Sequence, residues 1–240
     1  ETFGDYVSVY NFRDSVDDKA TVPLYYENRV PELKLKNPNI NQNIYEIVDD
    51  AELDEKQEEK LQREFSKEYH LITREDRLNS VAKDILEHFI NRGYGGKAMV
   101  VSIDKATAVK MYNKVHEARK EVINQLKERI LNAELDEVEP IKEKIEELTK
   151  LDMAVVISSE QNEIDKFKKL GLDIKPHRER MVKEDLASQF KNPKDNFRIV
   201  FVCNMWMTGF DVPCLSTIYL DQPMKNHTLL QTLARVNRVF

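Results

Sequence analysis

Four short and nearly unbroken apolar runs restrict the fold of this chain more than any other feature. They lie at residues 98–103, 154–157, 199–202 and 216–221. Between the first three runs, apolar residues recur every three or four positions, which is typical of amphipathic helices. Strands that are buried on both faces form continuous apolar runs, and strands that alternate with helices form parallel sheets. The sequence therefore predicts an α/β fold in which helices cover both faces of a parallel sheet.

Composition supports a folded domain and indicates little about its partner. Hydrophobic residues make up 41% of the 240 residues, which is sufficient for a packed core. No apolar run reaches the roughly 18 residues of a membrane span, so we expect a soluble protein without membrane contact. The net charge of −6 argues weakly against nucleic-acid binding, although basic residues are dense between residues 166 and 183. That stretch forms either a basic face or ordinary solvated helix faces.

The cysteines and histidines predict neither a disulfide framework nor a metal site. Cys203 and Cys214 do not form a C-x-x-C pair, and the five histidines are scattered without metal-ligand spacing. We therefore expect a reducing compartment, the cytoplasm, and no metal ligand on this chain.

The chain divides into three predicted segments. Residues 1–40 contain β-prone runs interrupted by prolines, and we expect them to form a linker or edge element. Residues 41–95 form a helical segment that leads into the main domain at residues 96–240. A long helix and a return helix at about 105–151 are expected to form a helical hairpin inserted between two strands.

Several residues predict where helices begin and end. Asp104 follows the first apolar run and is a plausible N-cap, because its side chain can accept from a free backbone N–H of the next helix. Gly93 and Gly171 follow helical patterns and are expected to end them, since glycine readily adopts the positive φ of a helix C-terminus. A further helical stretch is expected at about 181–190, and the pattern of the return helix resumes only after Pro140.

The loop at residues 208–213 follows the third apolar run and contains Gly209 and Asp211. Ligands of open α/β sheets bind beyond the carboxyl ends of the strands. Gly209 lacks a Cβ and would let backbone approach a phosphate or ribose, and Asp211 could accept from a ribose hydroxyl or an arginine. The alternative is an ordinary turn in which Gly209 supplies a positive φ and Asp211 caps the loop.

A helical pattern near the end of the chain carries an amide and two guanidiniums. Gln231, Arg235 and Arg238 are spaced i, i+4 and i+7, so they share one helix face. Guanidiniums are always charged and match the charge that develops on phosphate oxygens during phosphoryl transfer. The alternative is a basic surface helix. The order of the glycine-aspartate loop, one strand and then this helix favours phosphate chemistry.

These motifs resemble motifs V and VI of superfamily 2 helicases, and residues 98–102 occupy the place of motif IV. More narrowly, residues 205–213 and 231–240 resemble the restriction (motor) subunit of type I restriction-modification enzymes. Residues 20–29 are similar to the segment that joins the two motor lobes of that family. The resemblance implies that the domain is a second RecA-like motor lobe and that the enzyme translocates double-stranded DNA before it cleaves the DNA.

The resemblance also implies roles for residues near the nucleotide. Arg235 and Arg238 would act as arginine fingers that reach ATP on the first lobe. Gly209 and Asp211 would line the nucleotide cleft. Gln231 would link the state of the nucleotide to the contact between the lobes.

Two further residues are implied to face DNA. Asn204 and Thr208, near the start of the loop, would lie toward the DNA backbone or the interface between lobes. One position departs from the general helicase pattern, because Ala234 stands where many members have glycine. This departure loosens the match to the superfamily but fits the narrower family.

The cofactors and partners follow from the same resemblance. ATP and Mg²⁺ would be held mainly by the first lobe, because the chain has no Walker A loop and Gly93–Lys97 only imitates one before a strand. The partners would be double-stranded DNA and the modification and specificity subunits. The chain lacks an initiator methionine and ends soon after Arg238, so we expect a truncated lobe that is inactive alone. The rival interpretations are a lobe of another superfamily 2 helicase or remodeller, and a non-catalytic protein-interaction module.

Overall fold

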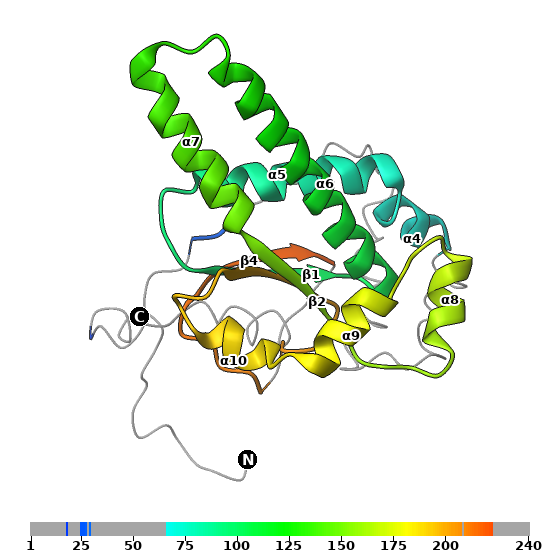
Figure 1. The fold of residues 1–240 in the computed structure, drawn as a ribbon. Helices are drawn as coiled ribbons and strands as arrows, with labels where there is room; N and C mark the ends of the chain where they lie inside the picture. Colours follow the sequence, from blue (N-terminus) through cyan, green and yellow to red (C-terminus); the bar gives the residue numbers. More distant parts are fainter. Residues whose placement is uncertain (1–17, 19–24, 28, 30–65, 208, 223–240) are drawn as a thin grey trace.

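The four apolar runs form one parallel sheet in the computed structural model of the chain (Figure 1). The structure describes residues 18, 25–27, 29, 66–207 and 209–222. The strands are β1 (Lys97–Ser102), β2 (Asp152–Val156), β3 (Phe197–Val202) and β4 (Leu215–Asp221). The helices are α4 (Ser66–Ile72), α5 (Glu75–Asn91), α6 (Lys105–Ile130), α7 (Leu135–Lys150), α8 (Glu163–Lys169), α9 (Lys175–Lys183) and α10 (Leu186–Lys191). The predicted RecA-like α/β fold is confirmed.

The strand order β2-β3-β1-β4 places β1 and β3 in the middle of the sheet. All three strand pairs are parallel, with Ala98 beside Ile199 between β1 and β3 and Ser102 beside Asp221 between β1 and β4. The carboxyl ends of the strands therefore meet at one side of the sheet, which we call the carboxyl edge. The opposite side is the amino edge.

Helices cover both faces of the sheet, as the continuous apolar runs predict (Figure 1). Ala98 and Val100 of β1 belong to one core cluster, which includes α5, α6 and α8. Met99 and Val101 belong to the other cluster, which includes α10 and the loop between β3 and β4. Because neighbouring residues of β1 are buried on opposite faces, the strand has no polar side, and this explains its unbroken apolar sequence.

The predicted helix signals are present in the structure. Asp104 caps α6 by accepting a hydrogen bond from the Thr107 backbone N–H at 2.6 Å. Gly93 has a φ of +73° after α5, and Gly171 has a φ of +72° after α8. These positions end their helices because glycine adopts a positive φ without a steric penalty.

Two helix predictions differ from the structure. The single stretch expected at about 181–190 is two helices, because Glu184 is extended and Asp185 starts α10 by accepting from the Ser188 N–H at 3.0 Å. The return helix α7 begins at Leu135 rather than after Pro140. Pro140 lies near the start of α7, where its missing N–H removes a single backbone hydrogen bond from the helix.

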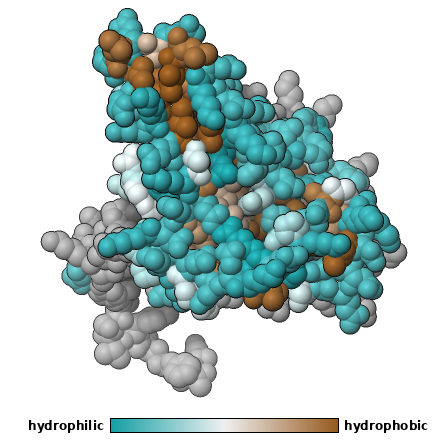
Figure 2. Space-filling model, in the orientation of Figure 1, coloured by the Kyte–Doolittle hydropathy of each residue, from teal (hydrophilic) through white to brown (hydrophobic). Residues whose placement is uncertain are grey.

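Helices α6 and α7, which lie between β1 and β2 in the sequence, form an antiparallel hairpin that projects from the sheet layer (Figure 1). Figure 2 shows an apolar stripe that runs along the hairpin to its tip. At the tip, Leu131 is 82% exposed and Leu135 is 96% exposed, whereas Leu148 near the base is buried. The base of the hairpin therefore belongs to the core and its tip does not.

The hairpin gives a prediction about stability. Replacing both Leu131 and Leu135 with serine is expected to change the free energy of unfolding by less than about 1 kcal/mol, because substitution of an exposed side chain removes little buried surface from the folded state. Leu148→Ala in the same hairpin is expected to lower it by about 2–5 kcal/mol, since it leaves a cavity. Urea titrations followed by circular dichroism would measure both. Equal effects of the two variants would contradict the distinction between tip and base.

No helix in the described part of the chain is both long and apolar enough to cross a membrane. The predicted linker at residues 1–40 lies almost entirely outside the described residues, and so do residues 41–65 of the helical segment predicted at 41–95. The proposed segment boundaries therefore stay a prediction.

Candidate functional site

The carboxyl edge gathers polar side chains from several strand ends. Ser102 ends β1, Asn204 follows β3, Asp221 ends β4 and Gln222 follows β4. Asp104 follows β1 and is buried, as are Ser102, Asp221 and Gln222. A parallel sheet brings these strand ends together although they are far apart in the sequence.

The loop between β3 and β4 contains an aromatic stack. The Trp206 ring is stacked on the Phe210 ring with centroids 4.1 Å apart and lies 5.7 Å from the Phe190 ring of α10. Trp206 has a φ of +66°, which a bulky residue rarely adopts and which persists only where its surroundings hold it. The stack therefore holds the backbone of this loop in a strained conformation directly after the carboxyl edge.

The loop leaves the carboxyl edge and returns to the amino edge at β4. Near its end, Cys214 is buried, and its thiol donates to the Phe190 carbonyl at 3.5 Å. The Lys97 backbone N–H donates to the Cys214 carbonyl at 2.8 Å. The loop thus covers the α10 face of the sheet on its way to the start of β4.

Gly209 and Asp211 lie on this loop and are exposed. Gly209 has a φ of +68°, and a Cβ added there would meet nothing within 4 Å. The backbone conformation therefore accounts for glycine at this position, as the ordinary-turn interpretation expects. Close approach of a nucleotide to Gly209 stays a prediction.

The structure places only some of the predicted site residues. Asn204 is half-buried at the carboxyl edge, and its carbonyl accepts from the Met207 N–H at 3.3 Å. The remaining predicted residues, Thr208, Gln231, Arg235 and Arg238, lie outside the described residues. Convergence of the two arginines with the glycine-aspartate loop therefore stays a prediction.

Comparison with known families decides the relationship of this chain. The family "Type I restriction enzyme subunit R domain 3" matches residues 92–240, which include the whole sheet and the loop just described. The chain belongs to the type I restriction enzyme R-subunit family. The SWI2/SNF2 ATPase family matches residues 1–59.

R-subunit relatives match the chain from end to end. It is 37% identical over 99% of its length to the putative type I restriction enzyme MjaIXP endonuclease subunit of Methanocaldococcus jannaschii. It is 31% identical over its full length to the type I restriction enzyme HindI endonuclease subunit of Haemophilus influenzae. In each case the match covers 20% of the relative, so the chain spans about a fifth of the length of these R subunits.

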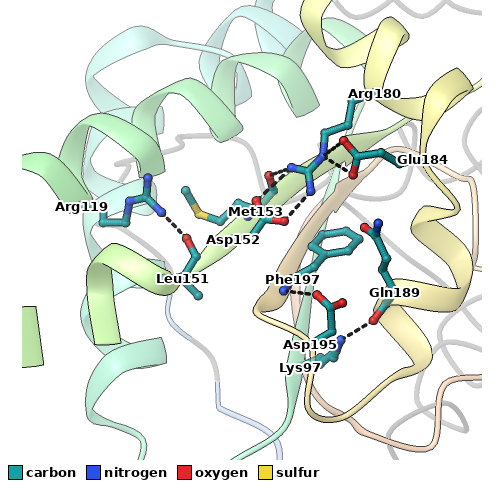
Figure 3. A network of polar contacts seen from close by, with 10 residues as sticks. All are labelled: Lys97, Arg119, Leu151, Asp152, Met153, Arg180, Glu184, Gln189, Asp195 and Phe197. Carbon is teal, nitrogen blue, oxygen red and sulfur yellow. Dashed lines mark hydrogen bonds and ion pairs between the residues drawn. The ribbon is translucent and has the colours of Figure 1, made fainter. Parts of the chain in front are cut away.

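The basic stretch of this R-subunit chain is compensated in part by carboxylates. Arg178 donates to Glu163 at 2.7 Å, and Lys183 lies 3.0 Å from Glu179. The Arg180 guanidinium contacts the carboxylates of Asp152 and Glu184 (Figure 3). Its hydrogen bonds to Asp152 raise the pKa of Arg180. These ion pairs favour the interpretation of the stretch as solvated helix faces rather than as a basic face for DNA.

Sequence reasoning missed the buried polar pairs at the carboxyl edge. Arg77 of α5 bonds Asp221 at 2.5 Å, and the Tyr69 hydroxyl donates to Asp104. Lys105 lies 2.9 Å from Glu160, and both side chains are nearly buried. One sequence signal could have indicated such a pair. Asp221 ends an apolar run, and a carboxylate that is buried there requires a partner.

The described residues contain no group of three or more histidine, cysteine, aspartate or glutamate side chains arranged to hold a metal ion.

Proposed function

We propose that the chain is the second motor lobe of a type I restriction enzyme R subunit and supplies arginines to ATP hydrolysis that drives translocation along double-stranded DNA. The observation that carries the proposal is a Q-x-x-x-R-x-x-R pattern that follows β4 of a RecA-like sheet in a chain of this family. The match of residues 1–59 to an ATPase family supports an ATP-driven activity for the whole subunit. Cleavage of DNA follows translocation in this proposal.

The proposed mechanism divides the chemistry between two lobes. ATP, with its Mg²⁺, binds mainly to the first lobe, which lies outside this chain. Arg235 and Arg238 stabilise the negative charge on the transferring phosphoryl group, because planar guanidiniums match phosphate oxygens. Gly209 and Asp211 line the nucleotide cleft. Gln231 transmits the state of the nucleotide to the contact between lobes.

The DNA-facing part of the proposal rests on the start of the loop. Asn204 lies at the carboxyl edge, and Thr208 follows the strained Trp206 in the sequence. Amide and hydroxyl groups can donate to phosphate oxygens without reading the base sequence. This suits an enzyme that moves along DNA of any sequence. The proposed partners are double-stranded DNA and the modification and specificity subunits in the cytoplasm.

The dependence of ATP hydrolysis on DNA tests the proposed function. The full-length subunit, assembled with its modification and specificity subunits, is expected to hydrolyse ATP only when double-stranded DNA carrying the recognition site is present. The purified 240-residue chain is expected to show no hydrolysis, because it lacks a Walker A loop. Phosphate release would measure both. Hydrolysis by the chain alone would overturn the proposal that it supplies half of the site.

Two other functions have a specific observation in their favour. The ATPase-family match over residues 1–59 would also suit a lobe of a chromatin remodeller or another superfamily 2 helicase. The exposed leucines at the hairpin tip would suit a non-catalytic interaction module. An interaction module does not account for the Q-x-x-x-R-x-x-R pattern after the glycine-aspartate loop, and the family match over residues 92–240 favours an R subunit over other helicases and remodellers.

A further inference from the structure

The end of β4 is held by a nearly buried ion pair. The Arg77 Nη2 atom lies 2.5 Å from the Asp221 Oδ1 atom, and the two side chains are 13% and 5% exposed. Arg77 lies in the first turn of α5, so the pair joins residues 144 positions apart. Asp221 is the last residue of β4 and stands ten positions before Gln231 in the sequence.

Arg77 connects Asp221 to a helical corner that is itself bound to the sheet. A second nitrogen of the Arg77 guanidinium donates to the carbonyl of Ile72, the last residue of α4, at 2.9 Å. In the same helix, the Tyr69 hydroxyl donates to Asp104, the N-cap of α6. The corner between α4 and α5 therefore contacts the carboxyl ends of both β1 and β4.

Asp221 depends on Arg77 for charge compensation. Burial raises the pKa of the Asp221 carboxyl, and the Arg77 guanidinium opposes that rise. The Asp221 Oδ2 atom is buried and makes no hydrogen bond to any described residue, and the same holds for Ser102 Oγ on the adjacent strand. A buried carboxylate without a cation is strongly destabilised. Removal of Arg77 would therefore leave the carboxylate at the end of β4 buried without its cation.

A comparable ion pair at the amino edge provides a contrast. Arg180 of α9 donates to Asp152, the first residue of β2, at 2.9 Å and to Glu184 at 3.0 Å (Figure 3). Arg180 is 25% exposed and Asp152 is 37% exposed. This pair also fastens a helix to a strand end, but at the edge where ligands of parallel sheets do not bind.

We propose that Arg77 is a positioning residue for the arginine-bearing segment. It holds the Asp221 carboxylate, and through it sets the point from which the chain leaves β4 toward Gln231, Arg235 and Arg238. The inference rests on the proposed function, since it requires that these arginines act on ATP.

The test compares three variants of the full-length subunit in its assembled complex. They are Arg77→Met, the double variant Arg77→Met/Asp221→Asn, and the control Arg180→Met. The single Arg77 variant leaves a buried carboxylate without its cation, whereas the double variant removes both charges. The measurements are the thermal unfolding midpoint and the kcat and KM for ATP with double-stranded DNA, taken below every midpoint.

Positioning predicts a separation of kcat from stability. Arg77→Met is expected to lower kcat by about 10- to 100-fold and to leave KM for ATP unchanged within about twofold. Displaced arginines would stabilise the transition state of hydrolysis less, whereas the binding of ATP before the reaction would not change. The double variant is expected to regain the unfolding midpoint but not kcat. Arg180→Met is expected to lower the midpoint and keep kcat.

Two results would overturn the inference. A kcat of Arg77→Met within about twofold of wild type would show that the pair does not position the arginines. Recovery of both kcat and the unfolding midpoint in the double variant would show that the pair only stabilises the fold. The comparison of the double variant with wild type is decisive even where Arg77→Met does not fold. A wild-type complex without DNA-stimulated hydrolysis would instead contradict the proposed function itself.

Discussion

Arg238→Ala in the full-length R subunit is expected to lower DNA-stimulated ATP hydrolysis by about 10³- to 10⁵-fold, the range typical of arginine fingers. The guanidinium would offset charge that develops on the transferring phosphoryl group, and alanine offers no replacement for it. The loss is expected mainly in kcat, because ATP itself binds mainly to the other lobe in the proposed mechanism. Steady-state phosphate release with saturating DNA would measure it.

A matched arginine in the hairpin serves as the control. Arg129 is exposed and pairs with Glu137 at 2.9 Å, so Arg129→Ala removes the same side chain from a surface ion pair that contributes little to stability. This variant is expected to keep wild-type turnover. Near-normal turnover of Arg238→Ala would contradict the assignment of the residue as an arginine finger.

Gly96→Ala is expected to lower the free energy of unfolding by about 3 kcal/mol or more. A Cβ at this position would lie 2.4 Å from the Ser216 Oγ atom and 2.9 Å from the Cys214 carbonyl oxygen. The φ of Gly96 is +93°, a conformation that disfavours alanine regardless of space. Because Gly96 directly precedes β1 and its neighbours lie at the start of β4, relief of the clash would separate two paired strands. Urea unfolding of the 240-residue chain would measure the change.

Gly95→Ala is the control for this substitution. A Cβ on Gly95 would meet nothing within 4 Å, and its φ lies outside the positive region. The adjacent variant is therefore expected to change the free energy of unfolding by less than about 1 kcal/mol. Equal destabilisation by both variants would show that the close contact with β4 does not explain the glycine at position 96.

Local signals predicted the elements of this fold well. Each strand is an apolar run, and Asp104, Gly93 and Gly171 mark helix ends through hydrogen bonds and backbone conformations that involve only neighbouring residues. The predictions that differed concern Pro140 within α7 and the break at Glu184. In both places the apolar pattern is ambiguous over a few residues, and hydrogen bonds and packing in the folded chain decide the boundary.

The candidate site was predictable only in part. The position of Asn204 and the glycine-aspartate loop after β3 could be predicted because they follow a recognisable strand, and their roles stay predictions. The strained Trp206 could not, since its ring packs on Phe210 of the same loop and beside Phe190 of α10, and only the folded chain brings Phe190 there. Arg77 also gave no sequence signal, because nothing in a helical pattern indicates which distant carboxylate it will meet.

The sequence by itself determined the class of fold, the helix ends at Gly93, Asp104 and Gly171, and the family, because periodicity, capping residues and motifs are local properties of the chain. The tertiary structure alone decided the strand order β2-β3-β1-β4 and the register that places Ser102 beside Asp221. It also decided the pairing of Arg77 with Asp221. These features depend on contacts between residues far apart in the sequence. Their contribution to stability depends on burial in the folded chain. A carboxylate such as Asp221 requires a cation only after the sheet and α5 have removed it from water.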